Sequence, residues 1–397
     1  HKCNMCNHRV EIGLLPSCQI VCPTEAIKIG DLDDPASEIS RIIARDDVAV
    51  RTPEQNTKPK VYYRGADQAS LDPTRSAIAN DGLIWADRTP AHQSVPVALG
   101  RRPVDEQGVV ARTTYTTAHA PTWDDKVSGY FVTKAVAGGM MVLAALQVAL
   151  GNADQQAAVG VVPPMVAGVF LALTAVLLIA DLKQPTRFHY LLTRGNSQSW
   201  LVRGAYVLLV FAVLTAAWWV AGLADAPVAL ELLAVPVALA GLAVAGYTAF
   251  LFAQCEGRDL WQSPVLLPLL LARAVVAGGA AYALLDLVMD IPDAAAMRWA
   301  FLGGVGAVAL LTWAETVSHA NRHVELAVQD MLHGAQARWF WAGVVLGIVV
   351  PAAVLVADRV ADWTAAGPAA LAGVSAMVGM FLAETAFVRA GQSVPLS

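Results

Sequence analysis

The stretch Val162–Ala180, VPPMVAGVFLALTAVLLIA, contains no charged residue. A run of about 19 apolar residues is long enough to cross the roughly 30 Å hydrocarbon core of a bilayer as an α-helix. Seven further runs share this length and apolar character: Val127–Leu150, Leu201–Leu223, Val228–Ala253, Val265–Val288, Arg298–Ser318, Trp339–Ala357 and Ala370–Val388. The sequence therefore predicts a mainly α-helical membrane protein with a bundle of eight transmembrane helices.

The composition of the chain agrees with this fold class. Of its 397 residues, 56% are hydrophobic and 15% are charged, and the mean hydropathy is +0.51. Soluble globular proteins have about 45–50% apolar and about 25% charged residues, so an ordinary cytosolic enzyme is excluded. The net charge of −5 comes with no basic stripe, and we therefore expect no nucleic-acid partner.

Four of the five cysteines lie within the first 22 residues, in the pattern C-x2-C-x11-C-x3-C-P formed by Cys3, Cys6, Cys18 and Cys22 with Pro23. Closely spaced thiolates hold iron–sulfur clusters, and the terminal Cys-Pro is typical of bacterial ferredoxins, where that cysteine ligates the other cluster of a two-cluster domain. A structural zinc site is the alternative, because C-x2-C also opens zinc ribbons. The pattern favours [4Fe–4S] iron ligation by all four cysteines.

The residues from Cys3 to Ile27, followed by Gly30-Asp31-x-Asp33-Asp34-Pro35, resemble the last cysteine motif of the iron–sulfur subunits in the DMSO-reductase (molybdopterin) family. Lys58–Tyr63 resembles the segment that closes those subunits. The resemblance implies a ferredoxin-like domain with four clusters, of which this chain contains one cysteine motif. It also implies a further ligand upstream of His1 or in a separate iron–sulfur subunit, with Cys22 serving a neighbouring cluster. A lone cluster bound by all four cysteines is the alternative.

Four regions follow from these patterns. We expect residues 1–63 to be the C-terminal part of a ferredoxin-like [4Fe–4S] domain, 64–126 an extended linker, 127–390 the eight-helix membrane domain and 391–397 a tail. In residues 64–123 the apolar side chains recur neither every 2 residues, as in a strand, nor every 3.6 residues, as in a helix. This segment also contains no run of 18 apolar residues. The iron–sulfur segment and the start of the first helix therefore lie on one side of the membrane, which we call the cluster side.

Basic residues near helix ends are concentrated on the cluster side. Only Arg298 and Arg359 lie on the opposite side, which carries acidic residues instead. The positive-inside rule then predicts a cytoplasmic iron–sulfur side. We expect the chain to lie in the inner membrane of a prokaryotic cell. The same bases could instead dock an acidic partner, and export of a folded catalytic subunit would make this side periplasmic. The cluster-side bases are Arg112, Lys126, Lys183, Arg187, Arg194, Arg203, Arg258, Arg322, Arg338 and Arg389.

Ionisable residues inside a bilayer are costly and are candidate functional groups. Lys134 lies about two turns into the first span, with Tyr130 one turn before it, and Asp181 closes the second span. Glu315 lies near the end of the sixth span, and His319 follows on the same helix face. We predict that these five residues bind a quinone. The alternative for Lys134 is that it reaches the interface or pairs with an acid.

Three further charged residues mark a possible proton path. Arg273 lies near the middle of the fifth span, Glu231 near the far interface and Glu384 near the end of the eighth span. Gly138-Gly139 and Gly278-Gly279 are interpreted as close-packing positions between helices. Cys255, alone after the fourth span, is interpreted as a small apolar residue.

The membrane part resembles the polysulfide-reductase-type (NrfD-like) quinone-interacting anchors. The resemblance implies electron exchange between the nearest iron–sulfur cluster and a membrane quinone, menaquinone or ubiquinone, without haem, beside a molybdopterin-containing catalytic subunit. The motifs that carry it are Tyr130-x-x-x-Lys134-x-x-x-Gly138-Gly139, Asp181-Leu182-x-x-Pro185-x-Arg187-Phe188, Ser199-Trp200-x-x-Arg203-Gly204-Ala205 and Glu256-Gly257-Arg258-x-Leu260-Trp261.

The histidines argue independently against haem, because six of the eight lie outside the predicted span interiors, and His319 and His323 share one helix face near the surface. The leading hypothesis is an electron-transfer and membrane-anchor subunit of a respiratory molybdoenzyme complex, such as a formate dehydrogenase or a polysulfide or thiosulfate reductase, with the primary catalytic site in another subunit. The alternatives are a proton- or ion-translocating membrane module with a regulatory iron–sulfur domain, and a purely structural anchor.

Overall fold

The computed structural model describes residues 5–67, 71, 123–182, 184–318, 320–360 and 366–394. These residues fall into two compact units, one formed by residues 5–67 and 71 and the other by the residues from 123 to 394. Most of the expected linker, together with Cys3, Lys183 and His319, lies outside the described residues.

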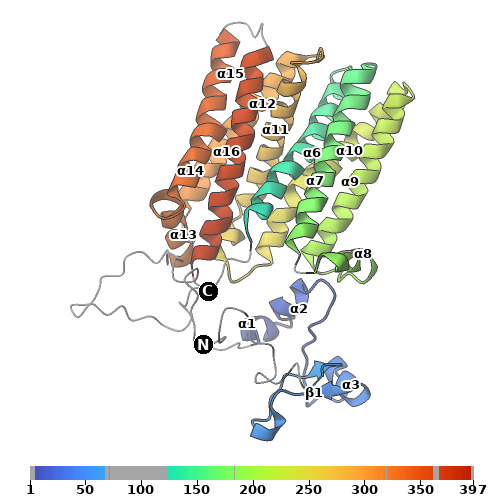
Figure 1. Cartoon of the computed structure of the whole chain (residues 1–397), viewed down its shortest axis with the longest axis vertical. Helices are drawn as coiled ribbons and strands as arrows, with labels where there is room; N and C mark the ends of the chain where they lie inside the picture. The colour runs from blue at the N-terminus through green and yellow to red at the C-terminus, as the bar shows by residue number, and fades with distance from the viewer. Residues whose placement is uncertain are drawn as a thin grey trace, which may run out of the picture. The chain divides into compact units, whose positions relative to one another are not determined.

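The second unit is a bundle of long helices (Figure 1). Within the described residues, eight helical segments are long and apolar enough to cross a membrane, which confirms the predicted count. Seven of them contain α6 (Asp125–Ala149), α7 (Val162–Asp181), α9 (Trp200–Leu223), α10 (Pro227–Ala253), α11 (Leu266–Leu285), α12 (Ala294–Val317) and α16 (Ala366–Ser393). The remaining span joins α14 (Ala337–Val344) and α15 (Val350–Val360) through a π-helical turn at Val345–Val349.

The first and last helices extend beyond the expected spans. The Asp124 carboxylate accepts a hydrogen bond from the Lys126 backbone N–H and caps the start of α6. The Gln392 side chain exchanges two hydrogen bonds with the backbone of Trp123, at 3.0 and 2.9 Å. Residues 391–393, which we expected in the tail, are therefore helical because these contacts join the end of α16 to the start of α6.

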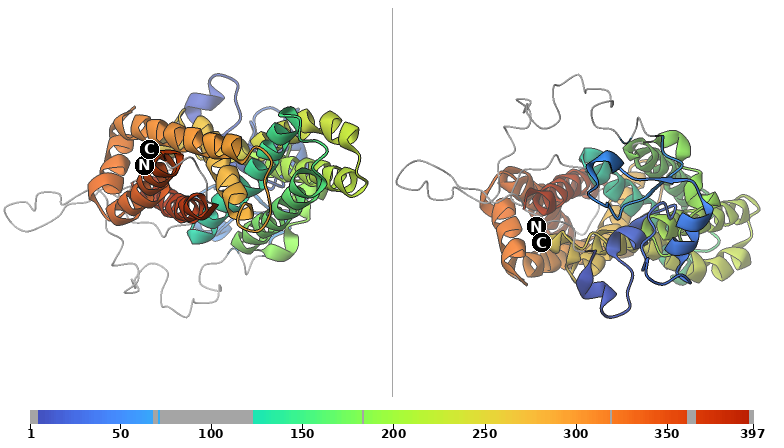
Figure 2. Two further views of the ribbon diagram at one scale, coloured as in Figure 1. Left: turned by 90° about the horizontal axis from the view of Figure 1, so that it is seen from above. Right: turned by 90° about the horizontal axis from the view of Figure 1, so that it is seen from below.

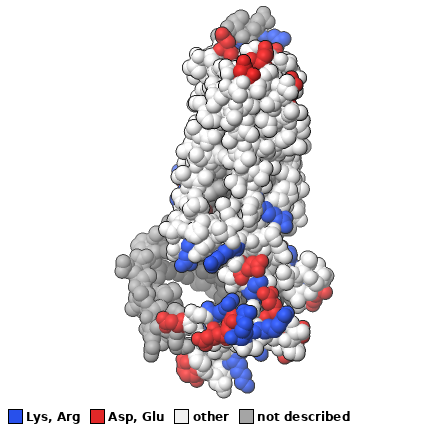
Figure 3. Space-filling model, turned by 90° about the vertical axis from the view of Figure 1, so that its right-hand side faces the viewer, with Lys and Arg blue, Asp and Glu red and all other residues white. Residues whose placement is uncertain are grey.

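The two ends of the bundle differ in charge. The end where α6 begins and α16 ends carries most of the bases, among them Lys126, Arg258 and Arg389, and we call it the basic end. The opposite, acidic end carries Asp154 and Asp225. Figure 3 shows that one side of the bundle is almost free of charged side chains between these ends, as expected for a surface that faces lipid.

Short elements cover the basic end (Figure 1). A 3₁₀ turn at Pro185–Arg187 and helix α8 (Tyr190–Thr193) follow α7, and a 3₁₀ turn at Asp259–Gln262 lies between α10 and α11. Helix α13 (Arg322–His333) lies between α12 and α14. These elements keep the connections between spans compact at this end.

Helix α6 lies at the centre of the bundle and packs against α7, α10, α11 and α16. Figure 2 shows α6, α7, α9 and α10 on one side and α12, α14, α15 and α16 on the other. Helix α11 joins the two groups because it packs against α6 and α10 as well as α12 and α16. A side chain on the inner face of α6 or α11 can therefore contact both groups.

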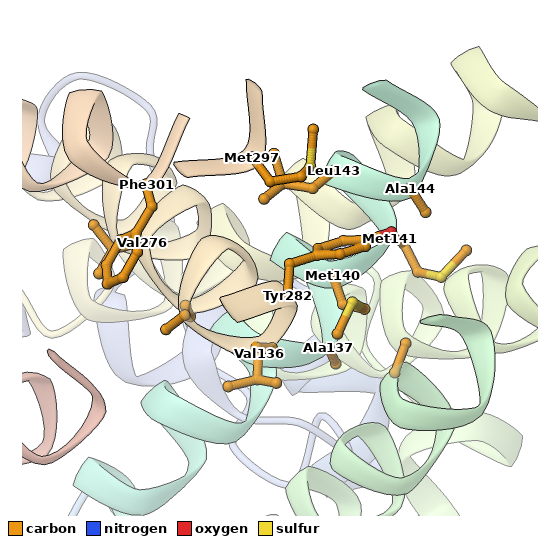
Figure 4. Close-up of a cluster of buried hydrophobic side chains, with 14 of the residues drawn as sticks. Val136, Ala137, Met140, Met141, Leu143, Ala144, Val276, Tyr282, Met297 and Phe301 are labelled. Atoms are coloured by element: carbon orange, nitrogen blue, oxygen red, sulfur yellow. The ribbon is translucent and has the colours of Figure 1, made fainter. Parts of the chain in front are cut away.

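The middle of the core is apolar. Figure 4 shows the ring of Tyr282 close to Met140 and Met141, with Met297 and Phe301 of α12 nearby. All five side chains are buried. This cluster fills the centre of the bundle with tightly packed apolar groups.

Two glycine pairs let α6 approach its neighbours closely, as the sequence predicts. A Cβ atom on Gly139 would overlap the carbonyl oxygen of Ala274 and would approach the backbone of Gly278. Gly138 and Gly241 are in similar contact between α6 and α10. Small residues permit such backbone contact between membrane helices, where close van der Waals packing drives association.

The first unit has little regular structure. It contains three short helices, α1 (Asn7–Val10), α2 (Ser17–Val21) and α3 (Glu38–Arg45), and a 3₁₀ turn at Pro53–Gln55. Strands β1 (Val48–Ala49) and β2 (Tyr63–Arg64) pair antiparallel, with Val48 opposite Arg64 and Ala49 opposite Tyr63. The described cysteines of this unit precede the strand pair in the chain. Cys6 lies at the start of α1, Cys18 lies within α2, and Cys22 lies at the end of α2.

We predict that Gly139→Ala destabilises the bundle by about 1–3 kcal/mol, because the added methyl group has no space between α6 and α11. The measurement is unfolding of the detergent-purified protein. Gly303→Ala is the matched control, since a Cβ atom there meets nothing within 4 Å, and its stability should stay within about 1 kcal/mol of the wild type. Equal unfolding curves for the two variants would contradict the close packing.

Candidate functional site

The side chain of Lys134 is enclosed within the bundle. It is 1% exposed and lies about 14 Å along α6 from its first residue, Asp125, which is too deep for the ammonium group to reach the interface. Its Nζ donates a hydrogen bond to the hydroxyl oxygen of Thr248 on α10. The ammonium group of Lys134 is thus enclosed by protein.

Aromatic rings surround the same ammonium group. Its Nζ lies 4.7 Å from the ring centroid of Phe131, 5.0 Å from that of Tyr247 and 5.6 Å from that of Tyr130. The electron-rich faces of such rings attract a cation, most strongly away from water. The phenol groups of Tyr130 and Tyr247 also interact with the hydroxyl of Thr248. We call these five residues the lysine cluster.

The motif around Gly204 serves this cluster. A Cβ atom on Gly204 would overlap the ring of Tyr247, so the glycine on α9 makes room for that ring. Neither Tyr247 nor Thr248 was among the predicted site residues. The available signal was that these two polar side chains follow each other in the part of α10 after Glu231, which is otherwise apolar.

An ion pair lies beside the lysine cluster. Glu384 on α16 is 1% exposed, and its Oε1 accepts a hydrogen bond from Nη1 of Arg273 on α11. Glu384 also interacts electrostatically with Lys134. Among the described residues its Oε2 has no hydrogen-bond partner. The carboxylate therefore lies between two buried cations and compensates their charge, which a low-dielectric interior requires.

Asp181 lies at the end of α7, as predicted, and is half-buried. It interacts electrostatically with Tyr130 of the lysine cluster and with Lys126 at the basic end. Asp181 thus lies between the buried cluster and the polar surface. Of the residues that the sequence predicts to act together, Tyr130 thus interacts with both Lys134 and Asp181.

Glu315 belongs to a different group of contacts. It is buried on α12, and its carboxylate accepts a 2.6 Å hydrogen bond from the hydroxyl of Ser263. It also interacts electrostatically with Arg273. The structure therefore connects Glu315 to the lysine cluster only through Arg273 and Glu384, as far as the described residues extend. Its expected neighbour His319 lies outside them.

The three residues of the expected proton path separate in the structure. Arg273 and Glu384 form the buried ion pair, whereas Glu231 is exposed near the start of α10, at the acidic end. A second buried ion group lies at that end, where Arg298 contacts Asp286 at 2.8 Å and Asp358 at 3.5 Å. This group joins α11, α12 and α15 and has a structural role.

The Glu256–Trp261 motif closes the basic end. One nitrogen of Arg258, Nη1, donates hydrogen bonds to the carbonyl oxygens of Gly391, Gln392 and Val394, at 3.4, 3.2 and 3.0 Å. A basic side chain is favourable at a helix C-terminus, where carbonyl groups lack intrahelical partners. The ring of Trp261 stacks on that of Trp123 at 4.7 Å. The motif therefore fixes the ends of α6 and α16, which position Lys134 and Glu384.

The described cysteines of the first unit lie around two short helices. Cys6 precedes α1 in a left-handed conformation, with φ of 53°, and Cys18 lies in α2, which Cys22 follows. The backbone N–H of Ala26 donates to Cys22 Sγ at 3.1 Å, and such bonds tune the sulfur ligands of iron–sulfur clusters. Among the described residues, no three His, Cys, Asp or Glu side chains group around a metal position. Thiolates are the ligands that iron–sulfur clusters require, and Cys3 of the motif lies outside the described residues.

Comparisons with known proteins identify the two units separately. Residues 116–395 match the family described as polysulphide reductase, NrfD. The first part of the chain is similar to iron–sulfur subunits. It is 47% identical over 62 residues to the arsenate respiratory reductase iron-sulfur subunit ArrB of Shewanella sp. (strain ANA-3), covering 16% of this chain and 26% of that protein.

Two more relatives are similar over a comparably short part. A tetrathionate reductase subunit of Salmonella typhimurium is 45% identical over 74 residues, which cover 18% of this chain and 30% of that protein. Protein NrfC of Escherichia coli (strain K12) is 40% identical over 62 residues, which cover 15% of this chain and 28% of that protein. The chain thus spans about a quarter to a third of the length of these curated relatives. The family match includes all eight membrane helices of the described residues, and the chain therefore belongs to the polysulphide reductase NrfD family.

Proposed function

We propose that this chain is the electron-transfer and membrane-anchor subunit of a respiratory oxidoreductase complex and passes electrons between [4Fe–4S] clusters and the membrane quinone pool. The observation that carries the proposal is the lysine cluster, a buried cation among hydrogen-bonding and aromatic groups, in a chain that also contains an iron–sulfur segment. The primary substrate would react on a partner subunit with a molybdopterin cofactor.

The lysine cluster has the chemistry that a quinone requires. Conversion of a quinone to a quinol consumes two electrons and two protons, so an oxygen atom of the ring passes through states that need a hydrogen-bond donor or a proton. The Lys134 ammonium can supply either, and the phenol groups of Tyr130 and Tyr247 are further donors. Aromatic rings and Thr248 complete a site suited to a flat, polar ring.

Two acids complement this role. Glu384 holds a negative charge beside Lys134 and can accept a proton from it through an oxygen that has no hydrogen-bond partner among the described residues. Asp181, half-buried between Tyr130 and Lys126, is suited to exchange protons with water at the basic end. The proposed proton exchange thus takes place on the side where α6 begins.

The electron donor or acceptor is the iron–sulfur segment. We propose that Cys3, Cys6, Cys18 and Cys22 ligate [4Fe–4S] iron, with further ligands from an upstream iron–sulfur part or a separate subunit. A cluster transfers single electrons, and its potential responds to hydrogen bonds such as that from Ala26 to Cys22. The surplus of bases at the basic end supports a cytoplasmic location of that end, in the inner membrane of a prokaryote.

The proton- or ion-translocating alternative has weaker support. It requires Arg273 and Glu231 to act in one path, yet Arg273 is paired with Glu384 and Glu231 is exposed near the acidic end. Apolar side chains such as Met140, Phe301 and Tyr282 pack in the core between the lysine cluster and that end. These observations favour electron transfer to a site on the basic side.

We predict that Lys134→Met lowers quinone-linked turnover of the purified complex on the order of 100-fold, because the proton and hydrogen-bond donor is removed. Turnover with a soluble artificial electron carrier should be unchanged. Lys126→Met is the matched control, because Lys126 lies on the same helix at the basic end and its Nζ pairs with Asp124 near the surface. Full quinone-linked turnover in Lys134→Met would refute the proposed site.

We further predict that Cys18→Ala lowers the iron content of the purified complex, whereas Cys255→Ala leaves it at the wild-type value. Burial raises the pKa of the Cys255 thiol to about 11, so this group stays protonated near neutral pH and is a poor ligand. The check is iron per complex together with the electron paramagnetic resonance signal of the reduced sample. Unchanged iron and an unchanged signal in Cys18→Ala would contradict cluster ligation by this motif.

A further inference from the structure

A groove lies in the half of the bundle that the lysine cluster does not occupy. Its enclosed volume is about 40 Å³, it is partly open to the outside, and it is lined by residues of α11, α12, α13, α16 and the span that contains α14. It extends from Phe340 and Glu315 near the basic end to Val276, Val308 and Ile348 at about mid-depth. The groove is thus narrow, and it follows the helices from near the basic end to about the middle of the bundle.

One wall of the groove is polar at successive depths. Glu315 lies close to the basic end of α12, Thr312 lies almost one turn deeper, and Arg273 lies about 10 Å along α11 from its first residue. The Thr312 hydroxyl is buried and has no hydrogen-bond partner among the described residues. The deeper part of the groove is lined by Val276, Val308 and Ile348. The groove therefore matches an amphiphile with a polar head and an apolar tail.

The charge of the polar wall and the depth of Arg273 in the bundle indicate which kind of head group a ligand in the groove would carry. The Arg273 guanidinium is already paired with Glu384, and Glu315 adds a second carboxyl group, so the polar wall has no surplus positive charge. A phosphate head would meet two acids, and it would have to leave the interface to reach Arg273. An uncharged head group with hydrogen-bonding oxygens meets neither obstacle. The wall therefore favours a neutral lipid-soluble molecule over a phospholipid.

The helix geometry at the groove supports a binding role independently. The span Ala337–Val360 contains the π-helical turn Val345–Val349, and two residues of this turn, Gly347 and Ile348, line the groove. Single π-helical turns within α-helices occur frequently at functional sites. The turn widens the helix where the apolar part of the groove begins.

The geometry points to a second quinone site in this groove, with the ring of a neutral quinone or quinol beside Arg273, Thr312 and Glu315 and its isoprenoid tail beside Val276, Val308 and Ile348. This inference rests on the proposed function, because it takes the quinone pool as the source of the ligand. The two sites are connected, since Glu384 pairs with Arg273 and interacts with Lys134. Occupancy of the groove would thus act on the charge balance of the lysine cluster.

The test is photolabelling of the intact purified complex with uncharged azidoquinones, one with a benzoquinone and one with a naphthoquinone ring, each with a short isoprenoid tail. Labelled peptides are identified by mass spectrometry. We expect label in two places, on peptides of α6 or α10 and on peptides from residues 308–348. Excess unlabelled quinone should suppress both, whereas added anionic phospholipid should suppress neither.

Val308→Trp fills the groove, because Val308 is buried and lines its apolar part. We expect groove labelling at least about 10-fold weaker, equivalent to about 1.4 kcal/mol, with label on α6 or α10 retained. Leu310→Trp is the matched control, since Leu310 on the same helix is 62% exposed and should leave both labels intact. Thr312→Val, a nearly isosteric change that will fold even if the tryptophan variant does not, should weaken groove labelling by about 2- to 10-fold.

Several outcomes would overturn the second site. It is refuted if the wild-type groove takes no label, or if Val308→Trp and Thr312→Val label like the wild type. It is also refuted if native mass spectrometry shows that Val308→Trp displaces a phospholipid instead of a quinone. Label on α6 or α10 alone would leave the proposed function intact and refute the groove, whereas label in the groove alone would support the groove and refute the Lys134 site.

Discussion

The burial of the Lys134 ammonium group inside a membrane bundle is the constraint on which the rest of the site depends. A cation at this depth needs compensating partners, because lipid and apolar side chains provide none. Thr248, three aromatic rings and the carboxylate of Glu384 supply them, and Glu384 in turn pairs with Arg273. The charges therefore extend across α6, α16 and α11 and connect the two halves of the bundle.

The scaffold around these charges is arranged to keep the central helices close together. Gly139 permits contact between the backbones of α6 and α11, while Arg258 and Gln392 fix the end of α16 to its neighbours. The lysine cluster and the Arg273–Glu384 pair lie in the half of the bundle near the basic end, the Arg298 ion group lies at the acidic end, and side chains such as Met140 and Phe301 fill the centre between them. This asymmetry supports chemistry on one side of the membrane, next to the helix that follows the iron–sulfur segment in the chain.

Much of this organisation could be predicted from particular residues. The apolar runs located eight spans, and Gly138-Gly139 predicted close helix packing. Tyr130 interacts with both Lys134 and Asp181, whose joint role stays a prediction. Glu315, expected beside them, instead bonds to Ser263, and Tyr247 and Thr248 were missed. The observed ends of the first and last helices also differ from the predicted bounds of the spans. Hydrogen bonds of the Asp124 and Gln392 side chains extend these helices beyond the apolar residues.

The number of membrane spans and the cysteine motif can be identified from the amino-acid sequence alone, because both are local properties. A long apolar segment must satisfy its backbone hydrogen bonds within itself, and ligand spacing is set along the chain. Which charged groups meet depends on how the helices pack. Lys134 and Thr248 are 114 residues apart, and Arg273 and Glu384 are 111 apart. In a membrane bundle the lipid-facing and inward-facing sides are both apolar, so the sequence pattern does not reveal how each helix is rotated toward its neighbours.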